Sequence, residues 1–270
     1  GNKIAIFNEN LKQIGISNHV AKGEKMYSSR FMGNKAYLVT YKTVDPLFVI
    51  DLSNETKPTV LGELHIPGYS TYLHPYDENH LIGIGMETEE IVNKNSIGKV
   101  TSTTSKITGM KMALFDVSDV NNPTQLSQTI IGDSRTTSAI LTNPKALLFS
   151  KEKQLLAIPV NNYSEDFEID SSIDSYSSIV DSYTNYNKSY VSEGYFVYKI
   201  NINDGFNLKG VITHETSQKN KNKSSYSYNY NNSKLLRGLY IDNNLYTISE
   251  TAIKVNNLDT LELIDELKIK

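Results

Sequence analysis

The chain has 270 residues, a net charge of −3, 39% hydrophobic residues and 21% charged residues. This composition is typical of a folded globular protein with a sizeable core, and the lack of a basic excess excludes an ordinary nucleic-acid binder. The sequence contains no cysteine, which excludes disulfides, thiolate nucleophiles and cysteine-ligated zinc, and its apolar runs are too short to insert into a membrane.

A unit of four short strands recurs along the chain. Its most regular part is a polar turn followed by an alternating apolar strand, as in GNKAYLVTY (33–41), DENHLIGIG (77–85), KEKQLLAIP (151–159) and DNNLYTISE (242–250). Short runs rich in Tyr, Val, Ile, Leu and Phe, bounded by Gly, Asn, Asp and Pro, are typical of strands and turns. Without its insertions the repeat is about 45 residues long, the length of one propeller blade. A sandwich would explain the alternation but not the constant strand order.

The repeat predicts an all-β fold, a β-propeller of four-stranded antiparallel blades, as one domain or segment over 1–270. The expected parts are a half blade within 1–17 and four complete blades at 26–67, 70–132, 145–214 and 235–270. A half blade exposes an unpaired strand edge. We therefore expect the chain to be a segment of a larger ring, although strands from elsewhere could also complete the half blade.

Three long segments interrupt the compact repeat, at 86–109, 161–193 and 215–234. In an up-and-down blade the second-to-third connections and the blade-to-blade connections emerge on the same face, so all three are expected there as long loops. Loops longer than about 12–15 residues are usually functional or disordered. Tyr, Ser and Asn would suit a recognition surface, and solvated low-complexity loops are the alternative. We expect a protein, peptide or glycan partner to bind this face.

Two segments carry a family resemblance. FVIDLSNETKPTVLGELHIPG and ALFDVSDVNNPTQLSQTIIGD are similar to LVIVD-type propeller repeats, and both place Asp seven residues before Pro, at Asp51 with Pro58 and Asp116 with Pro123. More closely, RFMGNKAYLVTYKTVDPLFVIDL and LGELHIPGYSTYLHPYDENHLIGIG resemble secreted bacterial proteins with a C-terminal beta-propeller domain, distantly related to WD-type repeats. The resemblance implies an extracellular or cell-surface location, although the chain itself shows no signal-peptide pattern.

The three arginines and one histidine are the ligand-binding candidates. Arg30 and His74 occupy matching positions on the predicted first strands of neighbouring blades. Arg237 is on the predicted first strand of the last blade, two residues further from the turn that follows, so its side chain is expected on the same side of the strand. First strands line the channel of a propeller, so these side chains could bind an anion there. Arg135 is expected on the long-loop face. The alternative is that these side chains form bonds between blades.

No catalytic or cofactor motif is present in the sequence. The five histidines lie on separate predicted strands and turns, and no spacing selects a catalytic triad, a phosphate loop or a dinucleotide fingerprint. The segment DVSDVNN (116–122) lacks the Gly and Glu of a calcium loop, so we interpret it as turn capping by Asx side chains. No cofactor is predicted. Weak calcium binding by acidic residues of the 161–193 segment is a minor alternative, the residues being Glu165, Asp166, Glu168, Asp170, Asp174 and Asp181.

These observations favour a non-enzymatic extracellular or cell-envelope binding scaffold. Two alternatives stay open. One is a metal-dependent hydrolase or lyase of the propeller type, with its site in the central channel, and the other is a structural module that accompanies a catalytic domain. A channel metal site needs several inward His, Asp or Glu side chains from different blades, and the predicted first strands supply few.

Overall fold

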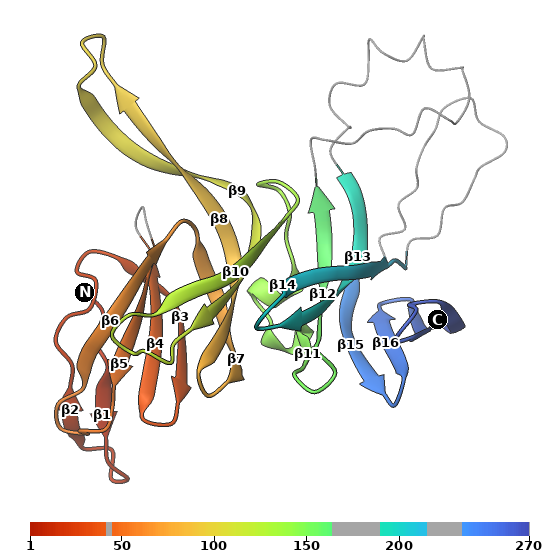
Figure 1. Cartoon of the computed structure of the whole chain (residues 1–270), viewed down its shortest axis with the longest axis horizontal. Coiled ribbons are helices and arrows are strands. Elements are labelled where there is room, and N and C mark those ends of the chain that lie inside the picture. Colours follow the sequence, from red (N-terminus) through yellow and green to blue (C-terminus); the bar gives the residue numbers. More distant parts are fainter. Residues whose placement is uncertain (42–44, 164–189, 215–233, 270) are drawn as a thin grey trace. The chain divides into compact units, whose positions relative to one another are not determined.

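The computed structural model describes residues 1–41, 45–163, 190–214 and 234–269. Within these ranges the chain forms 18 strands and two short 3-10 helices. The strands assemble into two compact units (Figure 1). The first comprises Gly1–Ser134 with Asn201–Phe206, and the second comprises Arg135–Ile200 with Asn207–Lys270.

The first unit contains a two-stranded sheet and two four-stranded antiparallel sheets. In each four-stranded sheet every strand pairs with the next one along the chain, which is the meander of a propeller blade. The two-stranded sheet is β1 (Ala5–Phe7) and β2 (Gln13–Ile16). The next sheet is β3 (Lys25–Met32), β4 (Lys35–Tyr41), β5 (Asp45–Asp51) and β6 (Thr59–Ile66). The third is β7 (Tyr69–Asp77), β8 (His80–Lys94), β9 (Val100–Asp116) and β10 (Thr124–Ile131).

The second unit contains two further four-stranded sheets of the same meander order. The first is preceded by the 3-10 helices η1 (Ala139–Leu141) and η2 (Pro144–Ala146) and comprises β11 (Leu148–Ser150), β12 (Leu155–Tyr163), β13 (Tyr190–Asn201) and β14 (Gly205–Ile212). The last comprises β15 (Leu235–Ile241), β16 (Asn244–Ser249), β17 (Ala252–Asn257) and β18 (Leu263–Lys268).

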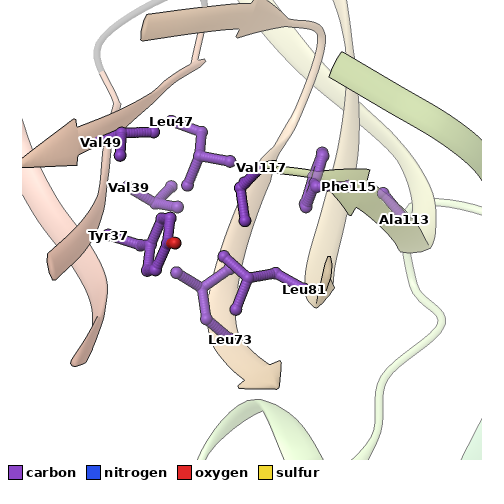
Figure 2. Packing of buried hydrophobic residues seen from close by; sticks show 9 residues of the cluster. All are labelled: Tyr37, Val39, Leu47, Val49, Leu73, Leu81, Ala113, Phe115 and Val117. Atoms are coloured by element: carbon purple, nitrogen blue, oxygen red, sulfur yellow. The ribbon is translucent and has the colours of Figure 1, made fainter. Parts of the chain in front are cut away.

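Neighbouring sheets within a unit bury apolar side chains against each other. Figure 2 shows the cluster between the β3–β6 and β7–β10 sheets, in which Tyr37 and Val39 meet Leu73, Leu81 and Phe115. The second unit has a corresponding cluster around Tyr195 and Val197. Apolar burial at about 25 cal/mol per Å² is the main force that holds such sheets together, so each pair of blades forms a rigid platform.

One expected loop was wrong. The segment 86–109 is a paired extension of β8 and β9, from Met86 facing Met110 to Lys94 facing Val100, and not a loop. Its Thr, Val and Ile residues favour extended backbone, and pairing satisfies the amide groups even though few of its side chains are buried. In the blade expected at 145–214, the first strand begins at Leu148, because Asn143 caps η2 and the chain becomes extended only after this turn.

The interpretation of DVSDVNN as a capped turn is confirmed. The Asp116 carboxylate accepts a hydrogen bond from the Ser118 amide at 2.8 Å, and the Asp119 carboxylate accepts one from the Asn121 amide at 3.0 Å. These hydrogen bonds lower the pKa of both carboxyls below the usual range. The side chains that resemble calcium ligands are therefore used within the turn itself.

Candidate functional site

The most prominent surface feature of the first unit is the outer part of the β8–β9 hairpin, residues 89–104, here called the hairpin arm (Figure 1). Every residue of the arm is exposed. Its tip is an Asn95–Lys99 turn in which the Asn95 carboxamide oxygen accepts hydrogen bonds from the Ile97 and Lys99 amides at 3.2 and 2.9 Å. The arm is thus a preformed ladder with a capped turn.

Apolar side chains lie along the arm among Thr, Ser, Glu and Lys residues. Ile97 at the tip is 83% exposed, and Val100 beside it is 51% exposed. Ile91 and Val92, further down the arm, are 40% and 44% exposed. Exposed apolar groups rimmed by polar ones are a usual mark of a contact surface for another molecule.

A buried ion pair fixes the base of the hairpin. The Lys111 ammonium on β9 lies 2.9 Å from the Glu87 carboxylate on β8, and the two side chains are 2% and 11% exposed. The ammonium also donates to the carbonyl of Pro67, in the connection that enters the sheet. The next amide in that connection, Gly68, donates to the Thr88 hydroxyl at 2.9 Å. The arm therefore projects from an anchored base.

Gly68 has a φ of +81°, which is in the region that favours glycine. A Cβ built there would come within 2.3 Å of the Met86 carbonyl oxygen. Gly68→Ala should therefore lower the melting temperature by several degrees, because it strains the backbone and pushes against the ion pair. Thermal unfolding checks this result, with Gly98→Ala as the control: Gly98 also has a positive φ, but nothing surrounds its Cβ position. Equal losses in the two variants would contradict a role of the close packing around Gly68.

Three tyrosines meet beside the hairpin base and form what we call the tyrosine cluster. The cluster comprises Tyr27 near the start of β3, Tyr41 at the end of β4 and Tyr69 at the start of β7. Their ring centroids are 4.6–5.8 Å apart. The Lys25 ammonium lies 5.2 Å from the Tyr27 ring centroid, and the Tyr41 hydroxyl is hydrogen-bonded to the Ser105 hydroxyl of β9. The rings remain half-buried. Rigid aromatic groups with polar tips offer contact area at a low entropic cost.

Tyr41→Phe tests the link between the cluster and the hairpin. The variant keeps the ring and removes only the hydroxyl that contacts Ser105. We expect a loss of about 1 kcal/mol in the free energy of unfolding and faster amide exchange in the hairpin near Ser105, with little change in the β4–β5 ladder. Hydrogen exchange followed by mass spectrometry measures both. Unchanged exchange in the hairpin would show that this hydroxyl does not hold the base.

The predicted ligand-binding residues fall in different places. Arg30 and His74 lie in the first unit, on the adjacent strands β3 and β7, as their spacing suggested. Arg237 is an exposed residue of β15 in the second unit. Arg135 is also exposed there, and its guanidinium lies 5.7 Å from the Tyr163 ring centroid. Arg30 and His74 are thus the two candidates that lie on contacting strands of one unit.

Three of the five histidines have separate polar partners. His80 Nδ1 lies 2.7 Å from the Asp77 carboxylate, and His65 Nε2 lies 3.2 Å from the Glu63 carboxylate. His214 is buried between the hydroxyls of Thr247 and Ser249, at 2.7 and 2.9 Å. Within the part of the chain that the structure describes, no three His, Asp or Glu side chains gather in a way that could hold a metal ion.

The other expected binding segments are outside the described residues, apart from their ends. Strand β12 continues to Tyr163 and β13 begins at Tyr190, so the 161–193 segment starts and finishes in paired strands. Its acidic residues, and the segment 215–233, are not described. The helices of the described residues are short 3-10 turns, and none of them is long or apolar enough to cross a membrane.

The strand order and the packing of the sheets define a propeller, and sequence comparison agrees. The model of the beta propeller domain family matches residues 1–261. The chain therefore belongs to the beta propeller domain family, and the predicted fold class is confirmed.

The curated relatives are archaeal proteins described as uncharacterized. One, from Methanocaldococcus jannaschii, is 39% identical over 169 residues, which cover 63% of this chain and 24% of the relative. Another, from Archaeoglobus fulgidus, is 26% identical over 270 residues, which cover 100% of this chain and 32% of the relative. The matches thus span 24% and 32% of the length of these relatives. They give no support to a bacterial origin or to LVIVD-type repeats.

Similarity to solved structures is distant. Sqt1 of Saccharomyces cerevisiae is 7% identical with a TM-score of 0.37, and the match covers 94% of this chain and 63% of that one. A variant of an apocarotenoid oxygenase from Synechocystis is 12% identical with a TM-score of 0.36, and the match covers 98% of this chain and 55% of that one. Likeness at this level carries no information about function.

Proposed function

We propose that this domain is a non-enzymatic binding scaffold and that it holds a protein partner through the hairpin arm and the neighbouring tyrosine cluster. The observation that carries the proposal is the contrast between the arm and its base. All of residues 89–104 are exposed, while the base is held by the Lys111–Glu87 pair. A rigid support with a solvated projection is the usual arrangement of binding elements on β-scaffolds.

The composition of the arm favours a protein or peptide over a glycan. The arm exposes aliphatic side chains, namely Ile91, Val92, Ile97 and Val100. Aliphatic groups in a polar rim suit the apolar core of a protein interface, whereas sugars are commonly held by aromatic rings and hydrogen bonds. The tyrosine cluster supplies rings at the base of the same surface, so a glycan contact there is the alternative outcome.

The proposed location is extracellular or at the cell surface. Its support is the resemblance of the first blades to secreted proteins that carry a C-terminal propeller domain. A surface location also suits a domain that presents an exposed arm to another protein. Fractionation of the native host with an antibody against this domain tests the location, and recovery only from the cytosol would contradict it.

Truncation of the arm tests the binding proposal. Glu90 faces Ser105 in the ladder, so residues 91–104 can be replaced by an Asn-Gly turn that joins these two positions. All the removed residues are exposed, and we expect the melting temperature to stay within a few degrees of the parent protein. Binding to proteins of the host surface fraction should be lost. A matched control, Ser53→Ala with Lys57→Gln in the β5–β6 turn, should bind as the parent does. Full binding by the truncated protein would refute the role of the arm.

A further inference from the structure

Arg30 carries a buried N–H donor for which the structure supplies no acceptor among the described residues. Its Nε atom is buried and has no hydrogen-bond partner among the described residues. No ion pair within the described part of the chain involves this side chain. Burying an N–H donor without a partner is costly, since the donor loses its hydrogen bond to water. A ligand that accepts a hydrogen bond from Nε would remove this cost.

A second orphaned polar group stands directly opposite. Tyr37 on β4 is the register partner of Arg30 on β3, and its phenol oxygen is buried with no partner within the described residues. Side chains at facing positions of an antiparallel pair are direct neighbours, with Cβ atoms about 5 Å apart. Burial raises the pKa of Tyr37 above its usual value, so the phenol stays a protonated donor. Two neighbouring donors thus lack an acceptor.

The adjacent strand adds polar groups without negative charge. On β7, the Tyr72 hydroxyl and His74 Nδ1 lie 3.0 Å apart. Burial and the positive charge of Arg30 lower the pKa of His74 to about 4, so the imidazole is neutral at pH 7. Burial raises the pKa of Tyr72 above its usual value, and the positive charge of Arg30 partly offsets this rise. The positive charge of Arg30 thus acts on both side chains of β7, and within the described residues no carboxylate forms an ion pair with Arg30.

We propose that Arg30 is the anchor of an oxyanion site at the first strands of the two blades of the first unit, with Tyr37, Tyr72 and His74 as its neutral polar surroundings. The ligand class is a carboxylate or a phosphate, because a guanidinium presents parallel N–H donors that match two oxygens of such a group. Arg30 as a whole is only partly buried, so a small anion can reach it. The inference is independent of the hairpin arm.

The small number of arginines makes a direct test possible. The chain has only Arg30, Arg135 and Arg237, so protein labelled with ¹⁵N-arginine gives three Nε–Hε signals, and Arg30→Gln identifies one of them. Titration with inorganic phosphate, and separately with acetate, should shift the Arg30 signal in a saturable way. Potassium chloride at the same ionic strength should not. The anion that saturates at the lower concentration identifies the preferred oxygen group.

Stability measurements with matched variants complete the test. Phosphate should raise the melting temperature of the parent protein and of Lys57→Gln, which removes an exposed positive charge of the same unit. It should not raise that of Arg30→Gln, and Arg30→Lys should show a reduced shift. Folding of each variant is checked by its unfolding transition without anion. An Arg30 signal that responds equally to chloride, or a phosphate effect that survives in Arg30→Gln, would overturn the proposal.

Discussion

Replacing Lys111 with methionine should lower the free energy of unfolding of the first unit by about 3–5 kcal/mol. The substitution keeps most of the side-chain volume but leaves the Glu87 carboxylate, 11% exposed, without its cation. An uncompensated buried charge is among the most destabilising changes a protein can carry. The Pro67 carbonyl loses its donor as well. Urea unfolding followed by circular dichroism measures the loss.

The double variant Lys111→Met with Glu87→Met separates charge from packing. Removing both charges leaves no unpaired ion, and replacement of a buried pair by apolar side chains is often neutral or stabilising. Most of the loss should therefore be recovered. A double variant as unstable as the single one would show that shape or the Pro67 contact, and not the charge, holds the hairpin base.

The buried His214 should make the second unit sensitive to acid. It lies 2.7 Å from the Thr247 hydroxyl and 2.9 Å from the Ser249 hydroxyl, and Ser249 is itself held by the Ala252 backbone. Burial, assisted by the charge of Lys254, lowers the pKa of His214 to about 4, against an opposing effect of Glu266. In the unfolded chain the pKa of histidine is about 6.5.

The sign of the effect follows from these two pKa values. Below pH 6.5 the unfolded chain binds a proton that folded His214 does not take up until about pH 4, so the free energy of unfolding falls between these values. The loss contributed by this group is about 3 kcal/mol at pH 4. His214→Gln cannot take up this proton. The stability difference between the parent and this variant, measured by native-state hydrogen exchange in β16, should shrink by that amount from pH 7.5 to pH 4. A constant difference would contradict a neutral, buried His214.

The regular part of each blade was predictable because local chemistry and packing agree there. KAYLVTY and LFVID alternate between two buried faces and end in polar turns, and they form β4 and most of β5. The Asx turn after Asp116 was likewise predicted, because an Asp side chain two residues before an amide is a local signal, and the structure shows an equivalent turn after Asp51.

The hairpin arm escaped prediction because its strands lack a buried face. A strand is usually recognised in a sequence by one continuous apolar face. The segments ETEEIVNK and VTSTTSK have no such face, and backbone pairing holds them together. Its β-branched residues were the available signal. The length of the segment was also misleading. The tight turn at Asn95–Lys99 occupies only the middle of a segment that was expected to be one long loop.

The candidate sites depend on contacts between distant segments. Lys111 meets Glu87 and Pro67, and Tyr41 meets Tyr69, only after neighbouring strands and blades have packed. A lysine inside the apolar run MKMALF was the one sequence signal of a buried ion pair. By contrast, the matching phase of Arg30 and His74 could be read from the repeat, because equivalent positions of adjacent blades lie near each other.

Site-specific photo-crosslinking from the hairpin arm is the most direct measurement of the proposed binding role. A photoreactive phenylalanine analogue is placed at Ile97, which is 83% exposed at the tip, and in a second protein at Ser53 in the β5–β6 turn. After irradiation with the host surface fraction, we expect one discrete adduct from position 97, competed by unlabelled parent protein but not by the protein without residues 91–104. The same adducts from both positions, or none from position 97, would contradict it.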